Sequence, residues 1–237
     1  MYEVGRAGDF VSRQMWRHRT RGSLYAAGAV TLALTAVGAL LGALLLDASA
    51  LKVTAAVAGL AAAAGCGYAW IRATRALGQA RRSAVGARSE REVRAAVRRT
   101  ESVAAAYGLV LGARGGDCDT VVFTRGCGAA AIEVKTGHGR VSAENGSMRV
   151  GKRVLHGDPA RQAANQARRL SRKLGGSTVL AVVCVPGMRN RPFTTAAGVW
   201  VCSARDLTAV LDRAPRVFGA AEEARETMRS LWHAAPV

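Results

Sequence analysis

Polar residues that could bind a metal ion or move a proton are concentrated in two short segments, GDCD at residues 116–119 and IEVK at residues 132–135. The second segment ends an apolar run that is typical of a β-strand. Side chains two residues apart in a strand share a face, so Glu133 and Lys135 point the same way. Asp119 begins the preceding strand, where its carboxylate is placed to meet that of Glu133 across the ladder.

Two carboxylates a few ångströms apart make a hard-oxygen site of the kind that Mg²⁺ or Mn²⁺ prefers. Beside them, Lys135 could orient an attacking water or stabilise the negative charge that develops on a phosphate. The same three residues could instead form a salt-bridge cluster without a metal, and their spacing alone does not separate the two interpretations.

The pattern around these segments predicts a mixed α/β domain. Residues 88–107 carry apolar side chains at helical spacing, and Gly108 would end that helix. A second helix is expected from Asp158 and Pro159 to Leu174, because Asp accepts the free amides and Pro suits the first turn. The other expected elements are strands at 109–111, 120–124, 129–135, 178–185 and 198–202, a hairpin of 140–141 with 148–150 around Asn145-Gly146, and a helix at 204–213.

Four stretches of the sequence, in this order, resemble the nuclease-related domain, NERD. They are GARSEREV, then GDCDTVVFTRGCGAAAIEVKTGHGRV with a glycine four residues after its lysine, then GDPARQAANQARRL and GVWVCSARDLTAVL. The resemblance covers about residues 86–214 and includes an opening helix with Gly-x-x-x-Glu. The family belongs to the PD-(D/E)XK nuclease-like fold, so the resemblance implies an α/β domain with a mixed sheet flanked by helices.

The resemblance also implies roles for individual residues. It places Asp119 and Glu133 on a metal ion and Lys135 at the reacting phosphate, with Glu90 and Gln162 completing the catalytic site. The implied activity is Mg²⁺- or Mn²⁺-dependent hydrolysis of phosphodiester bonds in nucleic acid, with DNA and RNA both open as substrates. The competing interpretation is a module of the same fold that binds nucleic acid or a protein partner without catalysis.

Helical geometry bears separately on two of these positions. Glu90 lies about 60° from the direction of Val93, at the edge of the apolar stripe of its helix. In the helix after Asp158, Gln162 and Gln166 share the stripe next to the buried one, at the edge of the core. Basic residues beside them are candidates for binding nucleic acid: Arg161, Arg168, Arg169, Arg172 and Lys173. Such a ridge is either a solvated helix face or a surface for phosphates.

Composition and charge limit the class of protein and its partners. The chain has 237 residues, 50% hydrophobic and 21% charged, which excludes disorder and several large domains. Five arginines face two acids in residues 1–23, residues 24–71 are balanced, and residues 72–237 hold 28 basic against 13 acidic residues. Nucleic acid and an anionic membrane surface are the partners that this charge favours. The five cysteines include no CxxC pair, so neither a zinc site nor a disulfide framework is expected.

Two apolar segments predict a transmembrane helical hairpin, in which the protein is integral to the membrane. Residues 24–46 are 23 uncharged residues, about 34 Å of helix, and residues 53–71 add 19 more. Arginines precede the first segment and follow the second. The positive-inside rule therefore puts both termini and the globular domain in the cytoplasm, at the plasma (inner) membrane.

Small residues are expected to bring the two helices of this hairpin together, with Gly38 and Gly42 facing residues such as Gly59. Two other interpretations of the apolar segments are open. One is a signal peptide cleaved after the ASA sequence at residues 48–50, and the other is a buried hairpin in a soluble protein.

The expected organisation of the chain has five parts. They are a basic cytoplasmic N-terminal segment (1–23), the transmembrane hairpin (24–71), a basic linker (72–87), the NERD-like domain (88–214) and a helical C-terminal tail (215–237). The tail has the spacing of an amphipathic helix, which would dock on either the domain or the membrane face.

Overall fold

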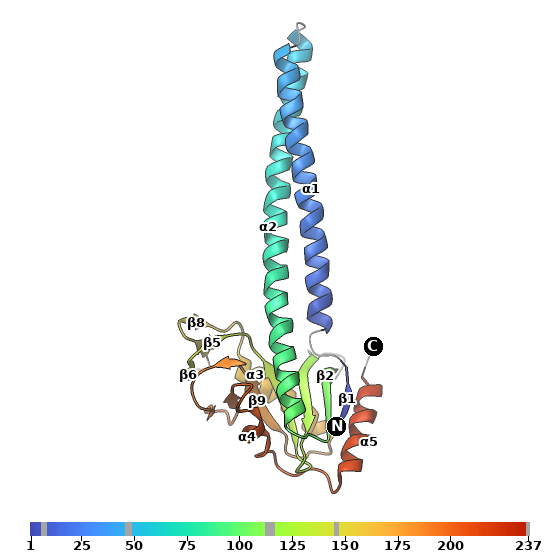
Figure 1. Cartoon of the computed structure of the whole chain (residues 1–237), viewed down its shortest axis with the longest axis vertical. Coiled ribbons are helices and arrows are strands. Elements are labelled where there is room, and N and C mark those ends of the chain that lie inside the picture. Colours follow the sequence, from blue (N-terminus) through green and yellow to red (C-terminus); the bar gives the residue numbers. More distant parts are fainter. Residues whose placement is uncertain (6–8, 46–48, 112–116, 145–146, 236–237) are drawn as a thin grey trace. The chain divides into compact units, whose positions relative to one another are not determined.

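The computed structural model describes residues 1–5, 9–45, 49–111, 117–144 and 147–235 (Figure 1). The chain divides into two compact units, one of Met1–Phe10 with Val85–Val237 and one of Val11–Ala84. Several expected features lie outside the described residues: the Gly116 position, the Asn145-Gly146 turn, and residues 46–48 between the two apolar segments.

The unit of residues 11–84 is a helical hairpin. It is formed by α1 (Asp9–Leu45) and the first part of α2 (Ser49–Arg99). Both helices are long and apolar enough to cross a membrane, and only 11% of the most apolar window of each is buried. The core helix of a soluble protein buries such side chains, whereas here residues such as Leu34 and Leu60 are exposed. Residues 72–87, expected as a linker, lie inside α2.

The two helices of the hairpin come close at Gly59, as the sequence predicted, but not at Gly38 and Gly42. A Cβ atom added at Gly38 or Gly42 would meet nothing within 4 Å. A Cβ at Gly59 would lie 3.0 Å from Leu40 Cγ, and one at Gly22 would lie 2.9 Å from Leu77 Cγ. The register of the helices therefore presents Gly59 to a leucine side chain and leaves the Gly38 and Gly42 positions open.

The other unit is built on a seven-stranded mixed sheet in the order β1-β2-β3-β4-β9-β12-β11. β2, β3 and β4 are antiparallel neighbours, and β4, β9 and β12 are parallel. In the chain, α3 lies between the short strands of residues 141–154 and β9. The strands are β1 (Tyr2–Val4), β2 (Ala104–Val110), β3 (Asp117–Phe123), β4 (Ala129–Val134), β9 (Leu180–Cys184), β11 (Phe193–Thr194) and β12 (Trp200–Cys202). This is the mixed α/β architecture that the sequence resemblance implied.

The helices and small sheets complete this unit. Asp158 caps α3, accepting a hydrogen bond at Oδ1 from the Arg161 amide at 2.9 Å, and Leu174 is the C-cap, as predicted. The expected hairpin forms from β6 and β7. The bounds are α3 (Pro159–Lys173), α4 (Leu207–Leu211), α5 (Ala221–His233), β5 (His138–Gly139), β6 (Val141–Glu144), β7 (Ser147–Val150), β8 (Arg153–Val154) and β10 (Gly187–Met188).

The helix expected to continue to Tyr107 ends at Arg99, and that part of the prediction is wrong. Residues 104–110 instead form β2, between β1 and β3 in the sheet. Ala104 and Ala106 pack into the core on one face of the sheet, and Ala105 and Tyr107 pack on the other. Alanine is a helix former, but pairing on both edges and burial on both faces override that preference.

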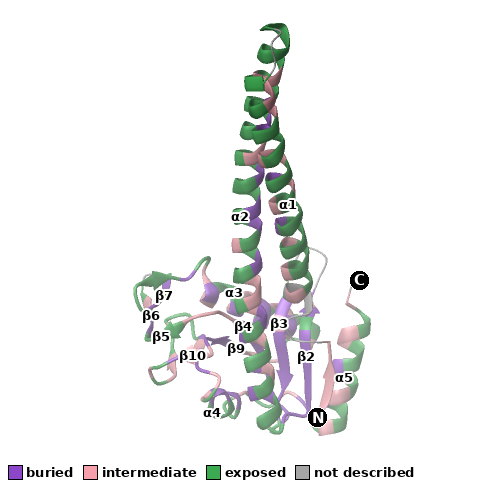
Figure 2. Cartoon of the chain, turned by 45° about the horizontal axis from the view of Figure 1, so that its top comes forward, coloured by how far each residue is buried: buried purple, intermediate pink, exposed green. Residues whose placement is uncertain are grey.

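Helices cover both faces of the sheet, whose central strands are buried (Figure 2). Ala167 and Leu170 of α3 and Met228 of α5 pack into the core on one face. Val93 of α2 and Leu207 of α4 pack on the opposite face. The C-terminal tail, whose docking site the sequence left open, therefore packs on the domain, where α5 contacts β1 and β2.

The first residues of the chain form an edge strand that the sequence did not predict. β1 pairs in parallel with β2, and Glu3 receives hydrogen bonds from Arg94 and Arg98 of α2 at 2.8–2.9 Å. These bonds, of which the one from Arg98 is the strongest cause, lower the pKa of Glu3 from 4.5 to about 2 against the opposing effect of burial. At Gly5, which follows the strand with φ of +73°, a Cβ would lie 2.3 Å from the Tyr107 carbonyl oxygen.

We predict that Glu3→Gln loosens the pairing of β1 with β2. Because the folded-state pKa of Glu3 is lowered, its stabilisation is present above about pH 4.5 and is lost as the pH falls toward 2. Allowing for solvent screening, it amounts to about 1–2 kcal/mol. At pH 7 the β1 and β2 amides of the variant should exchange roughly 5- to 30-fold faster, measured by hydrogen exchange on the full chain in detergent.

A matched control is Glu101→Gln, which removes an acid from the exposed ion pair with Arg125. It should leave exchange in β1 and β2 close to that of the wild type. Equal exchange in Glu3→Gln and the wild type at pH 7 would contradict the proposed role of Glu3.

Candidate metal and nucleic-acid site

Asp119 and Glu133 come from adjacent antiparallel strands. The pairing of Thr120 with Ile132 places Asp119 and Glu133 at the next positions of β3 and β4. The Asp119 carboxylate also accepts a hydrogen bond from the Val134 amide at 2.7 Å, which binds it to the end of β4. Strand register therefore brings together the two carboxylates that the sequence singled out.

Both carboxylates line a cavity of about 230 Å³, which we call the acid cavity. Its walls come from β3, β4 and α3, and α3 packs against β4 and β9. The lining residues are Asp117, Asp119, Glu133, Gln162, Asn165, Gln166 and Arg169.

Glu133 is a buried carboxylate, only 6% exposed, with a partner for each oxygen. Its Oε1 lies 2.6 Å from Lys135 Nζ, and its Oε2 accepts a hydrogen bond from Gln166 Nε2 at 2.6 Å. The Lys135 amide in turn donates to the Cys184 carbonyl of β9 at 2.9 Å. A buried charge requires this compensation, because an unpaired carboxylate in a protein interior is costly.

The charge on Asp119 is not balanced in the same way. Burial, and then repulsion from Glu133, raise the pKa of Asp119 from 3.8 to about 7. The Val134 amide and Lys135 act in the opposite direction, and Glu90 adds further repulsion. The charges of Glu90, Glu133 and Lys135 therefore all act on Asp119, and a cation bound beside Asp119 would lower its pKa.

The chemistry of the donors fits a magnesium or manganese ion better than zinc. Within the described part of the chain, no group of three or more His, Cys, Asp or Glu residues is arranged as a metal site. Mg²⁺ is commonly held by only one or two carboxylates and keeps several waters. Asp119 and Glu133 supply such a pair, with amide side chains of α3 in the same cavity.

The structure adds Gln166 to the residues that the sequence selected. The expected residue Gln162 lines the acid cavity and is exposed, whereas Gln166, one turn later, is buried and bonded to Glu133. Gln166 Nε2 also donates to the Asp117 carbonyl at 3.2 Å, and its Oε1 accepts from Cys118 Sγ at 3.6 Å. The shared stripe of the two glutamines was the sequence signal that could have identified Gln166.

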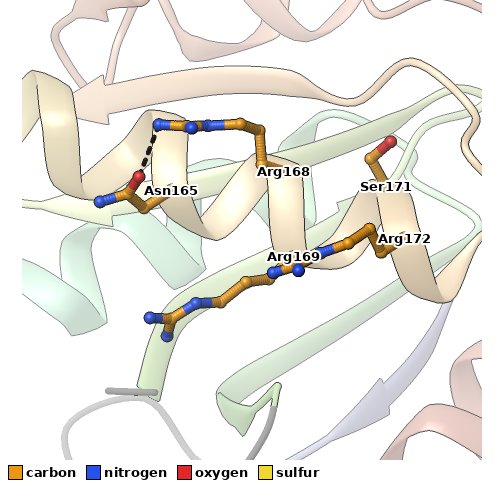
Figure 3. A pocket seen from close by; sticks show the side chains of 5 residues that line it. All are labelled: Asn165, Arg168, Arg169, Ser171 and Arg172. Atoms are coloured by element: carbon orange, nitrogen blue, oxygen red, sulfur yellow. Dashed lines mark hydrogen bonds between the residues drawn. The ribbon is translucent and has the colours of Figure 1, made fainter. Parts of the chain in front are cut away.

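The expected basic residues of α3 fall into two groups. Arg168, Arg169 and Arg172 line a second cavity of about 520 Å³ together with Asn165 and Ser171 (Figure 3), which we call the arginine cavity. Arg168 is held there by a hydrogen bond that its Nη2 donates to Asn165 Oδ1 at 2.6 Å. Arg161 and Lys173 are exposed and do not belong to the lining of either cavity.

In this unit a helix is followed by three antiparallel strands, a second helix and a parallel strand. Glu-x-Lys lies at the end of the third antiparallel strand. This arrangement defines a PD-(D/E)XK nuclease-like domain. Residues 85–188 match the family model described as the nuclease-related domain, and this part of the chain is a nuclease-related (NERD) domain. None of the curated proteins and none of the solved structures compared with the chain matches it.

We predict that Gln166→Leu destabilises the domain and that Gln162→Leu does not. The first change puts an apolar side chain of similar size in place of the amide and leaves Glu133 Oε2 and the Asp117 carbonyl without their donor, at a cost of about 1–3 kcal/mol. The second change affects an exposed side chain and should cost less than about 0.5 kcal/mol. Pulse proteolysis of the full chain across a urea series measures both values, and equal midpoints for the two variants would exclude this role of Gln166.

Proposed function

We propose that this protein is a membrane-anchored, metal-dependent nuclease that hydrolyses phosphodiester bonds of nucleic acid on the cytoplasmic side of the membrane. The observation that supports this most directly is the pair of Asp119 and Glu133 in the acid cavity of a nuclease-related domain, with Lys135 bound to Glu133.

In this proposal Asp119 and Glu133 hold Mg²⁺ or Mn²⁺. The bound ion would polarise the scissile phosphate and lower the pKa of a bound water. Lys135 Nζ, 2.6 Å from Glu133, orients the attacking water or stabilises charge on the phosphate oxygens. Glu90 and Gln162 complete the catalytic site, Glu90 through its charge near Asp119 and Gln162 through its place in the lining.

The basic residues of α3 would bind the nucleic acid backbone. Arg161, Arg168, Arg169, Arg172 and Lys173 present cations along one helix, and the helix dipole also favours Arg172 and Lys173 in its last turn. Phosphate contacts of this kind release counterions and do not depend on base sequence. The proposal therefore applies to DNA and RNA alike.

A second function is favoured by one observation, the complete pairing of Glu133. Lys135 and Gln166 already engage both of its oxygens, as in a structural salt-bridge cluster. A domain in which that cluster persists would bind nucleic acid or a protein partner without cutting a strand. Metal binding separates the two functions.

We predict that the full chain in detergent binds Mn²⁺ with measurable heat and cleaves plasmid DNA or RNA in a metal-dependent reaction. Glu133→Gln and Asp119→Asn should abolish both, because each removes one of two charged ligands. Lys135→Ala should abolish cleavage and leave the heat largely intact, because a lysine is not a ligand. EDTA should stop cleavage by the wild type.

Glu144→Gln provides the control, since it removes an exposed acid of β6 outside the acid cavity. Its calorimetric trace and its cleavage should equal those of the wild type. Heat without cleavage would assign the protein to the binding-module function. No heat for the wild type would refute the metal site.

The hairpin would anchor the domain to the plasma (inner) membrane with both of its ends in the cytoplasm. Its two apolar helices are exposed along their length, and arginines precede the first and follow the second. Trp16 near one end of the hairpin and Trp70 near the other are 59% and 60% exposed. Both would then lie at the same interface, where amphipathic rings are enriched.

We predict that topology reporters fused after residue 48 and at the C-terminus report opposite sides of the membrane, the second being cytoplasmic. The reason is that a hairpin with both basic ends inside exposes only its turn outside. The protein should also resist extraction by alkaline carbonate. Reporters on the same side, or release into the carbonate wash, would exclude an integral hairpin.

A further inference from the structure

We propose that the acid cavity and the arginine cavity form one track that holds consecutive phosphates of a single nucleic-acid strand. The scissile phosphate would lie at Asp119 and Glu133, and the following phosphates would bind Arg169 and Arg172. This inference rests on the proposed function and deepens it, because it defines the substrate as a strand with at least two further phosphates on one side of the cut.

The two cavities share part of their lining. Asn165 and Arg169 belong to both. Arg169 therefore borders the cavity of Asp119 and Glu133 as well as the cavity of Arg172. A ligand that fills the acid cavity and extends along α3 passes Arg169 first and Arg172 next.

Some arginines of the domain have acidic partners, and others, among them Arg169 and Arg172, have none within the described residues. Arg94 and Arg98 pair with Glu3, and Arg125 pairs with Glu101. Within the described residues no carboxylate lies within ion-pair distance of Arg169 or Arg172. Their guanidinium groups remain available to an anion, and bidentate binding of phosphate is the interaction for which a guanidinium is suited.

The direction of the side chains agrees with a track. Figure 3 shows Arg168, Arg169 and Arg172 all extending toward the Asn165 end of the helix. Long side chains of a helix generally point toward its N-terminus. Here that preference carries the charges of Arg169 and Arg172 toward the acid cavity, which Gln162, Asn165 and Gln166 line from the same helix.

The spacing along α3 also suits a strand. Arg169 and Arg172 follow Gln166, the partner of Glu133, by three and six residues, or about 4.5 and 9 Å of helix. One strand of nucleic acid carries a phosphate about every 3.4 Å along its axis. The two arginines therefore match phosphates within about three nucleotides of the scissile one.

The test measures binding separately from cleavage. The full chain in nanodiscs of neutral phosphatidylcholine, with EDTA present, is titrated with a fluorescent single-stranded DNA 12-mer across a salt series. Arg169→Ala and Arg172→Ala should each reduce the slope of log affinity against log salt by about 0.7, the contribution of one phosphate of a single strand, and the double variant by about 1.4.

The matched control is Arg125→Ala, which removes the same charge at the other end of the β3–β4 hairpin from Asp119 and Glu133. Its slope should equal that of the wild type. Equal slopes for Arg172→Ala and Arg125→Ala, or no binding by the wild type, would overturn the track.

Cleavage of the same strand by the wild type in Mn²⁺ tests the proposed function independently. Reduced slopes without cleavage would support the track on a protein that only binds. Cleavage with unreduced slopes would keep the nuclease and reject the track.

Discussion

The site depends on the burial of one carboxylate at the junction of a strand and a helix. Glu133 is 6% exposed, and Lys135 and Gln166 compensate it from β4 and α3. Removing one partner of such a buried charge costs far more than an exposed pair contributes. The same contacts therefore fix how α3 lies on the sheet. They place its glutamine stripe in the acid cavity and its arginines beside it.

The N-terminal strand imposes a second constraint. Glu3 joins β1 to the last turns of α2, so the residues that precede the hairpin and those that follow it are bound to one another inside one compact unit. The two arginines lower the pKa of Glu3 to about 2, so this connection stays charged even in acid well below physiological pH. A chain that leaves and re-enters one domain at joined points suits a hairpin with both ends on one side of the membrane.

Features encoded by local chemistry could be predicted from the sequence, and features that depend on distant partners could not. Asp158 and Pro159 marked the start of α3, and Glu133 and Lys135 in an apolar strand marked the site. Residues 104–107 have helical spacing, yet they form a strand because β1 and β3 flank them. β1 has only three residues, and its partner lies about a hundred residues further along the chain. The spacing placed Gln166 and Gln162 on one stripe of α3, but it could not show that Gln166 is the one buried against Glu133.

The row of arginines on α3 is better explained by an anion than by the stability of the free helix. Three like-charge pairs on α3 are spaced three or four residues apart, and each costs about 0.2–0.5 kcal/mol. They are Arg168 with Arg172, Arg169 with Arg172, and Arg169 with Lys173. The helix dipole offsets this by about 0.3–1 kcal/mol per cation, but only for residues of the last turn, Arg172 and Lys173. The two effects nearly cancel, so the row of arginines changes the stability of the free helix very little. Phosphates bound along the row would remove the repulsion between the arginines and leave their favourable interaction with the helix dipole unopposed. In the proposed complex the net gain would appear on binding of the strand.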